Sequence, residues 1–231
     1  MGSGHVSISR LVAELLLHSG APGRATVHRD DGRAEALREL GAEIVAGDLT
    51  CPGDVAAALV RVTRMFFNMT VSTDYLEATA VACPSADERG DPEELVKMSQ
   101  KTVSQTTSTS TEESRHQRLH WLAERILNWS GRPVVHVRST VFLDSSLFTL
   151  IASHSVADRG VLALPFGTDG TSPIVATDVA RVIAALLQDF ADRVGHVYEL
   201  TGPAVLDIDR DRTITTEEVA WSGPPESRQA K

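Results

Sequence analysis

The stretch Met1-Gly-Ser-Gly-His-Val-Ser7 leads directly into an amphipathic helix predicted over residues 8–19. A glycine-rich turn at a helix N-terminus can bind a phosphate group, because the first amide N–H groups lack partners within the helix and the helix dipole favours negative charge. The glycines also lack the Cβ atoms that would hold a phosphate away. Alone this turn is weak evidence, since two glycines at this place are equally typical of a flexible end.

A second feature, Ala25-Thr-Val-His-Arg29, follows about twenty residues later, at the spacing of a dinucleotide-binding fold. There the end of the second strand meets the adenosine ribose, where an acidic residue prefers a 2′-hydroxyl and an arginine accommodates a 2′-phosphate. Arg29 stands at that strand end, directly before Asp30 and Asp31. The pattern favours NADP, with NAD as the alternative; a solvated turn over residues 28–31 is the non-functional interpretation.

The third feature is Gly41-Ala-Glu-Ile-Val-Ala-Gly-Asp-Leu-Thr50, in which residues 43–46 are a predicted strand. At the end of such a strand, the Asp48 carboxylate could hold the edge of an adenine, and Leu49 could cover the ring. Each of the three features follows the last at the spacing of a βαβ unit. Their order is therefore stronger evidence than any one of them.

Short apolar runs continue to alternate with helical patterns along the chain. This pattern predicts an α/β fold, a doubly wound parallel sheet covered on both faces. Further strands are predicted over residues 25–28, 65–67, 95–98, 134–137, 161–165 and 196–201. Further helices are predicted over residues 33–40, 52–62, 74–81, 112–129, 147–152 and 178–190, the last with Thr177 as its N-cap. Residues 99–111 hold nine Ser or Thr and are predicted to form a mobile loop without a core of its own.

Composition narrows the class of protein. The 231 residues are 42% hydrophobic and carry a formal net charge of −9, which disfavours nucleic acid and anionic membranes as partners. No apolar run is long enough to span a bilayer, and no secretory signal is evident. The two cysteines, Cys51 and Cys83, form no metal or redox motif. The sequence therefore predicts a cytoplasmic protein.

From Gly2 to about Val219, the chain resembles the NmrA-like branch of the atypical short-chain dehydrogenases/reductases. The resemblance rests on an ordered series of loose motifs: the stretch 41–50 quoted above, Leu95-Val-Lys-Met-Ser99, His120-Trp-Leu-Ala-Glu124, Ser130-Gly131, Val137-Arg-Ser-Thr-Val-Phe142, Pro173-Ile-Val-Ala-Thr-Asp178-Val-Ala and Tyr198-Glu-Leu-Thr-Gly-Pro203. It implies an NAD(P)-binding Rossmann-type core over residues 1–145. Residues 146–231 would then form a small C-terminal region that shapes the substrate cleft.

The resemblance also implies positions for the cofactor. Gly4 matches the middle glycine of the family's G-x-x-G-x-x-G, whereas Met1 and Ser7 replace the outer two. The loop over residues 139–142 approaches the nicotinamide, and Ser139 stands where the family usually has proline. The expected cofactor-binding residues are Gly2, Gly4, His5, Val6, Ser7, Arg29, Asp48, Leu49, Phe67, Asn68, Met69, Thr140 and Phe142.

The expected catalytic residues depart from the wider superfamily. Its Tyr-x-x-x-Lys pair is missing, because Tyr75 and Tyr198 are not followed by a lysine four residues on. The matching helix carries His120-x-x-x-Glu124 instead, in which His120 could exchange a proton and Glu124 could orient it. Ser99 matches a catalytic serine. Helix packing and salt bridging are the alternative roles for His120 and Glu124.

A metal site is the weaker interpretation of the same helix. His116, His120 and Glu124 share one face, but no third ligand is suggested from elsewhere in the chain. No metal is therefore expected.

Three functions remain open at this stage. The first is an NAD(P)H-dependent oxidoreductase that acts on a small organic acceptor, a quinone or a carbonyl compound. The second is a non-catalytic NAD(P)-binding sensor that works through a protein partner, and the third is a scaffold without cofactor. A homodimer is compatible with each.

The family's first strand, which lies mid-sheet before the glycine turn, has no counterpart in the sequence. Its loss would leave the second and fourth strands unpaired or force them to pair directly. A truncated start and a diverged member with an incomplete cofactor site both explain it.

Overall fold

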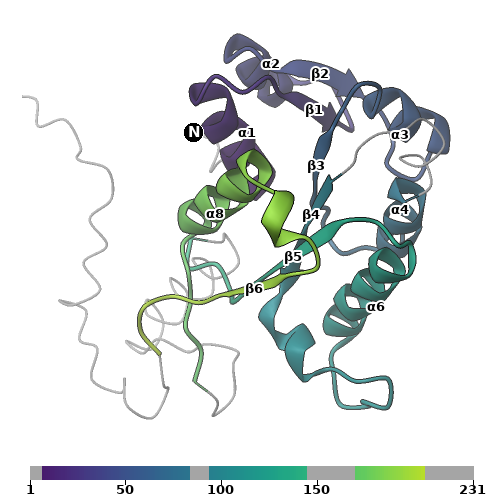
Figure 1. Cartoon of the computed structure of the whole chain (residues 1–231), viewed down its shortest axis with the longest axis vertical. Coiled ribbons are helices and arrows are strands. Elements are labelled where there is room, and N and C mark those ends of the chain that lie inside the picture. Colours follow the sequence, from purple (N-terminus) through teal and green to yellow (C-terminus); the bar gives the residue numbers. More distant parts are fainter. Residues whose placement is uncertain (1–6, 84–93, 145–169, 206–231) are drawn as a thin grey trace, which may run out of the picture.

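The computed structural model describes residues 7–83, 94–144 and 170–205. Its strands are all parallel and fall into two groups (Figure 1). In the first, β1 (Arg24–Val27) pairs with β2 (Glu43–Ala46). The second has the order β3 (Arg64–Phe67), β4 (Glu94–Gln100), β5 (Val134–Ser139) and β6 (Val197–Leu200). The strands β1 and β3 correspond to the second and fourth strands of the family's sheet. Among the described residues they do not pair with each other, so direct pairing does not replace the family's first strand.

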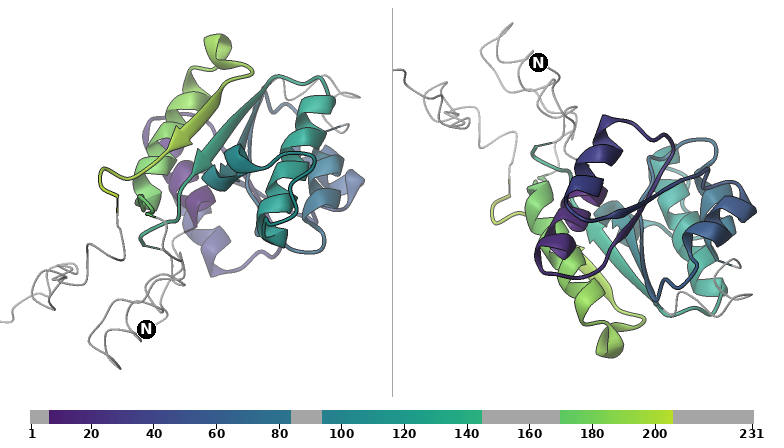
Figure 2. Two further views of the ribbon diagram at one scale, coloured as in Figure 1. Left: turned by 90° about the horizontal axis from the view of Figure 1, so that it is seen from below. Right: turned by 90° about the horizontal axis from the view of Figure 1, so that it is seen from above.

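Helices cover both faces of the larger sheet (Figure 2), as the sequence predicts. On one face lie α1 (Ile8–His18) and α8 (Ala176–Gln188), and on the other α4 (Tyr75–Ala82) and α6 (Arg115–Trp129). The remaining elements are α2 (Gly32–Glu39), α3 (Pro52–Ala58) and the 3-10 turns η1 (Lys101–Gln105) and η2 (Ala191–Arg193). No helix in the described ranges combines the length and apolar character that a bilayer crossing needs.

The two faces of the sheet differ in chemistry because side chains alternate along each strand. Val96 and Val137 point to the α1/α8 face, which is mainly apolar and carries the buried Ser139 at the end of β5. Leu95 and Val134 begin an equally apolar core on the α4/α6 face. Further along the same strands, however, that second face carries the buried polar residues Lys97, Ser99 and His136 and the partly buried Arg138.

Arginines at the start of two strands fix neighbouring helices. Arg24 donates from Nη1 to the carbonyls of Ala58 and Val60 at the end of α3, both at 2.8 Å. Arg64 donates from Nη1 to the carbonyl of Leu187, at 2.6 Å, and to that of the following residue at the end of α8. Each guanidinium satisfies carbonyls that have no partner within the helix and complements the negative end of its dipole.

The predicted helix bounds agree within two residues for α1, α2, α4 and α8. Helix α3 instead ends at Ala58, four residues before its predicted end at residue 62, and Arg61 in the turn that follows has a positive φ.

Thr177 lies inside α8, and the prediction that it is the N-cap is wrong. The Asp144 carboxylate instead accepts a hydrogen bond from the amide of Ala176 at 3.0 Å. Helix α6 begins three residues later than predicted, because the Ser114 hydroxyl caps it by accepting from the Gln117 amide.

Several predictions fall outside the described residues. They are the glycine turn over residues 1–6, the helix over 147–152 and the strand over 161–165. The predicted boundary between the Rossmann-type core and the C-terminal region, at residue 145, falls at the start of the undescribed residues 145–169 and stays a prediction.

Gly202 offers a direct test of the packing after β6. Its amide donates to the Ser172 carbonyl at 2.9 Å, and a Cβ atom on Gly202 would lie 1.8 Å from the Pro173 carbonyl oxygen. We expect Gly202→Ala to lower the free energy of unfolding by about 2 kcal/mol or more, since backbone must move to relieve the overlap. Urea denaturation measures this.

Gly32→Ala is the matched control, because a Cβ atom there would meet no atom within 4 Å. It should leave stability unchanged or raise it by up to about 1 kcal/mol. Equal stability of the two variants would contradict the close approach at Gly202.

Candidate functional site

The carboxyl ends of the parallel strands collect most of the predicted site residues along one edge. Arg29 follows β1, Asp48 follows β2, Asn68 follows β3 and Thr140 follows β5, while Ser99 is near the end of β4. In open parallel sheets this edge is where ligands bind, because the loops there diverge and leave room.

The start of α1 lies against the end of β3. The Asn68 side chain donates from Nδ2 to the Ser9 hydroxyl at 3.0 Å, which joins the first turn of α1 to this edge. Ser7 is the N-cap residue and its side chain makes no capping hydrogen bond. The first amide N–H groups of α1 have no partners within the helix, so the positive end of its dipole sits where a phosphate would be favoured.

Arg29 is exposed in the turn after β1, and its two acidic neighbours are already paired. Asp31 caps α2 and bonds Arg33 at 2.8 Å, and Asp30 bonds Arg38 at 2.8 Å. The Arg33 side chain and amide hold the pKa of Asp31 well below its usual value. Within the described ranges Arg29 has no hydrogen bond or ion pair, so its charge is available to an anion.

The carboxylate of Asp48 is held by its own turn. Its Oδ1 atom accepts from the amide and the hydroxyl of Thr50, at 2.8 and 2.7 Å, and the pKa of Asp48 is lowered as a result. Leu49, Phe67 and Met69 all contribute to the apolar core beside α4. Phe67 is itself 5% exposed, so it supports the edge from within.

Beyond β5, the chain is tied to the segment that precedes α8. The Thr140 hydroxyl donates to the Ser172 carbonyl at 2.5 Å, and Phe142 forms a β-bridge with Ile174. These contacts place the predicted nicotinamide loop beside the end of β6, because the Thr140 amide also donates to the Leu200 carbonyl.

The two predicted catalytic residues of α6 have different partners. Both oxygens of Glu124 accept from Arg138, at 3.1 Å from Nε and 2.7 Å from Nη2. The Nδ1 atom of His120 instead lies 3.0 Å from the hydroxyl of Tyr75. The prediction that Glu124 orients His120 is therefore wrong: α4 supplies the orienting group, since Arg138 engages the carboxylate.

Burial dominates the electrostatics around His120. It lowers the pKa of His120 to about 3, with Lys97 and His116 acting in the same direction and Glu124 against them. Burial also raises the pKa of Tyr75, so its hydroxyl keeps its proton. At neutral pH, His120 is an uncharged imidazole beside an uncharged phenol.

Lys97 lies fully buried in the middle of β4. Its Nζ atom donates to the Met98 carbonyl at 3.0 Å and lies 5.7 Å from the centre of the Tyr75 ring. Burial lowers its pKa to about 8, with Glu124 acting in the opposite direction. A tyrosine and a lysine thus come together from different elements, although the sequence lacks the superfamily's spaced pair.

A line of charges runs from the interior to the strand ends. Burial alone would raise the pKa of Glu124, but the Arg138 guanidinium outweighs it and the pKa is lowered. Ser99 adds to this lowering, although its Oγ atom has no partner within hydrogen-bond geometry among the described residues. Arg138 also lies 3.5 Å from Glu199, which pairs with Lys101.

Sequence reasoning missed Tyr75, Lys97 and Arg138. One signal was present: in the buried strands β4 and β5, polar residues alternate with apolar ones at Lys97 and Ser99 and again at His136 and Arg138. Such alternation on a face covered by helices indicates a buried polar network.

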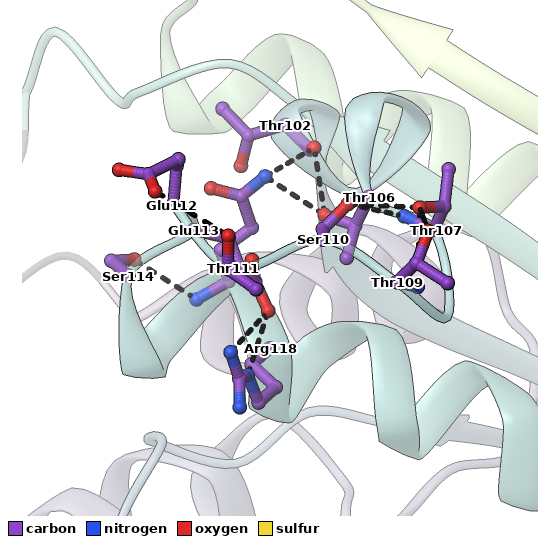
Figure 3. A network of polar contacts seen from close by, with 11 residues as sticks. Thr102, Thr106, Thr107, Thr109, Ser110, Thr111, Glu112, Glu113, Ser114 and Arg118 are labelled. Carbon is purple, nitrogen blue, oxygen red and sulfur yellow. Dashed lines mark hydrogen bonds and ion pairs between the residues drawn. The ribbon is translucent and has the colours of Figure 1, made fainter.

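The Ser/Thr-rich segment takes part in a network of polar contacts (Figure 3). Residues 101–105 form η1, and Val103 is 2% exposed, so the prediction of a segment without a core was wrong. From α6, the side-chain amide of Gln117 donates through Nε2 to the Thr102 carbonyl and to the Thr106 hydroxyl, both at 2.8 Å. Its predicted use as a lid over the cleft stays a prediction.

The histidine stripe of α6 is engaged in other contacts. His116 Nδ1 lies 3.1 Å from the Gln100 side-chain oxygen, and the His116 and His120 rings are 5.0 Å apart. In the part of the chain that the structure describes, no three His, Cys, Asp or Glu side chains are grouped so as to hold a metal ion.

Comparisons with known proteins place this geometry in context. No protein-family model matches the chain. It is 28% identical over 205 residues to an NAD(P)H azoreductase of Xenophilus azovorans, covering 87% of this chain and 66% of that protein. Its structure matches an NADPH-dependent quinone oxidoreductase of Escherichia coli in complex with NADPH, with a TM-score of 0.75 and 18% identity over 89% of this chain. The fold is of the Rossmann type.

A second solved structure agrees. The triphenylmethane reductase of Citrobacter sp. in complex with NADP(H) matches with a TM-score of 0.72 and 16% identity, covering 88% of this chain. The chain spans 69% of the length of both solved structures. It therefore corresponds to about two thirds of the length of the reductases it matches.

Removing Arg138 tests whether the ion pair with Glu124 holds α6 on the sheet. We expect Arg138→Met to lower the free energy of unfolding by roughly 3–5 kcal/mol at pH 7, because it leaves a buried carboxylate unpaired. An unpaired buried Glu124 has a raised pKa, so the folded state takes up a proton more readily than the unfolded state as pH falls. The loss should therefore shrink at pH 5 in urea denaturation.

Arg181→Met removes an exposed pair with Asp178, where both side chains are more than half exposed, and should change stability by about 0.5 kcal/mol or less. The double variant Glu124→Leu/Arg138→Met should recover most of the loss. If Arg138→Met costs no more than Arg181→Met, the pair is not what anchors α6.

Proposed function

We propose that this chain is an NAD(P)H-dependent oxidoreductase of NmrA-like type that reduces a small organic acceptor, a quinone or a carbonyl compound. The observation that carries the proposal is the edge where the start of α1 meets Asn68 and where Arg29 is left without a partner among the described residues. The similarity to an azoreductase and to solved NADPH-binding reductases supports it. Azo compounds are therefore further acceptors to test.

The residues present fit a phosphorylated nicotinamide cofactor. The open amides at the start of α1 suit the pyrophosphate, Arg29 suits a 2′-phosphate, and the carboxylate of Asp48 suits the adenine edge. We favour NADP over NAD for this reason. When bound, the reduced nicotinamide supplies a hydride, that is, two electrons and one proton.

The protein's own task is to position the acceptor and stabilise the charge that it gains. Ser99 of β4 and His120 of α6 are buried polar residues of the α4/α6 face, and we assign them to the acceptor. Since His120 is uncharged at neutral pH, it can donate a hydrogen bond to the reduced oxygen, while solvent supplies the second proton. A quinone, one hydride and one proton then give the hydroquinone.

Steady-state turnover tests the proposal. The chain should oxidise NADPH in the presence of a quinone or an azo dye, and Gly4→Val should raise the KM for NADPH about tenfold or more, because the added side chain displaces the pyrophosphate. Gly32→Ala is the control and should match the parent chain. Failure to oxidise NADPH with quinones, aldehydes and azo dyes alike would contradict the oxidoreductase.

Arg29 tests the choice of cofactor. Arg29→Ala should raise the KM for NADPH about tenfold, because a charge-assisted contact to the 2′-phosphate is lost, and should leave that for NADH unchanged. Arg181→Ala, at an exposed pair on α8, is the charge-matched control. An equal effect of Arg29→Ala on both cofactors would show that Arg29 does not read the 2′-phosphate.

A non-catalytic NAD(P)-binding sensor is the second candidate. Two ionisable groups are poorly placed for proton transfer, which favours this candidate. Glu124 is paired with Arg138, and the phenol of Tyr75 is buried with a raised pKa. This candidate predicts cofactor binding without turnover of any acceptor, and a protein partner in pull-down experiments.

A further inference from the structure

The hydrogen bond between Tyr75 and His120 joins two helices inside the α4/α6 face. The phenol oxygen lies 3.0 Å from Nδ1, and the two rings meet edge to face with centres 5.3 Å apart. Tyr75 is 1% exposed and His120 is 9% exposed, so water does not compete freely for this bond. Nothing in hydride transfer itself explains why α4 supplies a buried hydroxyl here.

The direction of the bond follows from the chemistry of the two groups. A buried phenol keeps its proton because burial disfavours the phenolate, so Tyr75 donates and Nδ1 accepts. A neutral imidazole carries one N–H, and when Nδ1 accepts, the proton is on Nε2. Of the two ring nitrogens of His120, only Nδ1 has a hydrogen-bond partner among the residues that the structure describes, which leaves the Nε2–H for a ligand.

Charged groups on the elements packed around His120 also affect whether its imidazole ring takes up a second proton. Lys97 from β4 and His116 from α6 disfavour a second proton on His120, and Glu124 from α6 favours one. Glu124 is neutralised by Arg138 from β5. The hydroxyl from α4 therefore acts on a ring that is already held uncharged.

We propose that Tyr75 is a positioning residue that fixes His120 in the tautomer with its proton on Nε2, so that His120 acts on the acceptor as a neutral hydrogen-bond donor. The catalytic consequence rests on the proposed function; the tautomer does not. As the hydride reaches the acceptor, the Nε2–H stabilises the resulting anion and stays on the ring. The second proton comes from solvent, so no imidazolium forms and no imidazolate is left.

Nitrogen-15 NMR of the histidine rings tests the tautomer without any substrate. His120→Gln assigns the signals of His120 among the eight histidines. In the parent chain we expect one tautomer, with Nε2 protonated and Nδ1 unprotonated, unchanged from pH 8 to pH 5. A proton on Nδ1, or an imidazolium at pH 5, would overturn the proposal by itself.

Two variants separate positioning from packing. Tyr75→Phe keeps the ring and removes the hydroxyl, and should give a mixture of both tautomers. Tyr198→Phe alters the chain's other tyrosine, on β6, and should leave the His120 signals unchanged. An unchanged tautomer in a folded Tyr75→Phe would contradict the proposal; if that variant does not fold, the parent chain alone still decides.

Turnover provides the second readout. Tyr75→Phe should lower kcat in proportion to the fraction of His120 that leaves the Nε2-protonated tautomer, about twofold for an even mixture, with an unchanged KM for NADPH, because a wrong tautomer impairs the chemical step and not cofactor binding. Tyr198→Phe should match the parent. A parent chain with the expected tautomer but no turnover would refute the proposed function and leave the tautomer standing; turnover with a mixed tautomer would refute only the role of Tyr75.

Discussion

A carboxylate without access to solvent sets the geometry of one whole side of this protein. Glu124 is fully buried on α6, and its two oxygens are met by Arg138 on β5. Because a buried charge is tolerated only when paired, α6 is held against the sheet at this point. Arg138 reaches on to Glu199 of β6, so the same contact ties three elements together. His120, one turn before Glu124, takes its place on the sheet face from this anchor.

The α4/α6 face is divided along the strands. The end where Leu95 and Val134 lie is an apolar core that stabilises the fold, and the end where Lys97 and Arg138 lie is a polar network that opens toward the strand ends. The residues that stabilise the fold and the polar residues of the candidate site thus follow one another along the same strands. The opposite face, against α1 and α8, is mainly an apolar core.

The order of helices and strands could be predicted because it depends on local patterns; residues 43–46 form β2 with the predicted bounds. The positions of Arg29 and Asp48 just after two strands could also be predicted from sequence alone, and their role in cofactor binding stays a prediction. Contacts between distant elements were missed. Nothing local to residue 177 shows that Asp144 caps α8, and the composition of residues 99–111 hides the burial of Val103. The partner of His120 lies 45 residues away, beyond any motif.

The central claim is that the edge formed by α1, Arg29 and Asn68 holds a nicotinamide cofactor. Equilibrium titration of the chain into NADPH, followed by nicotinamide fluorescence, tests it without assuming any acceptor. The account predicts a saturable change in fluorescence that excess NADP⁺ reverses. No binding at millimolar cofactor would contradict both the oxidoreductase and the sensor, and would leave a Rossmann-type scaffold without its ligand.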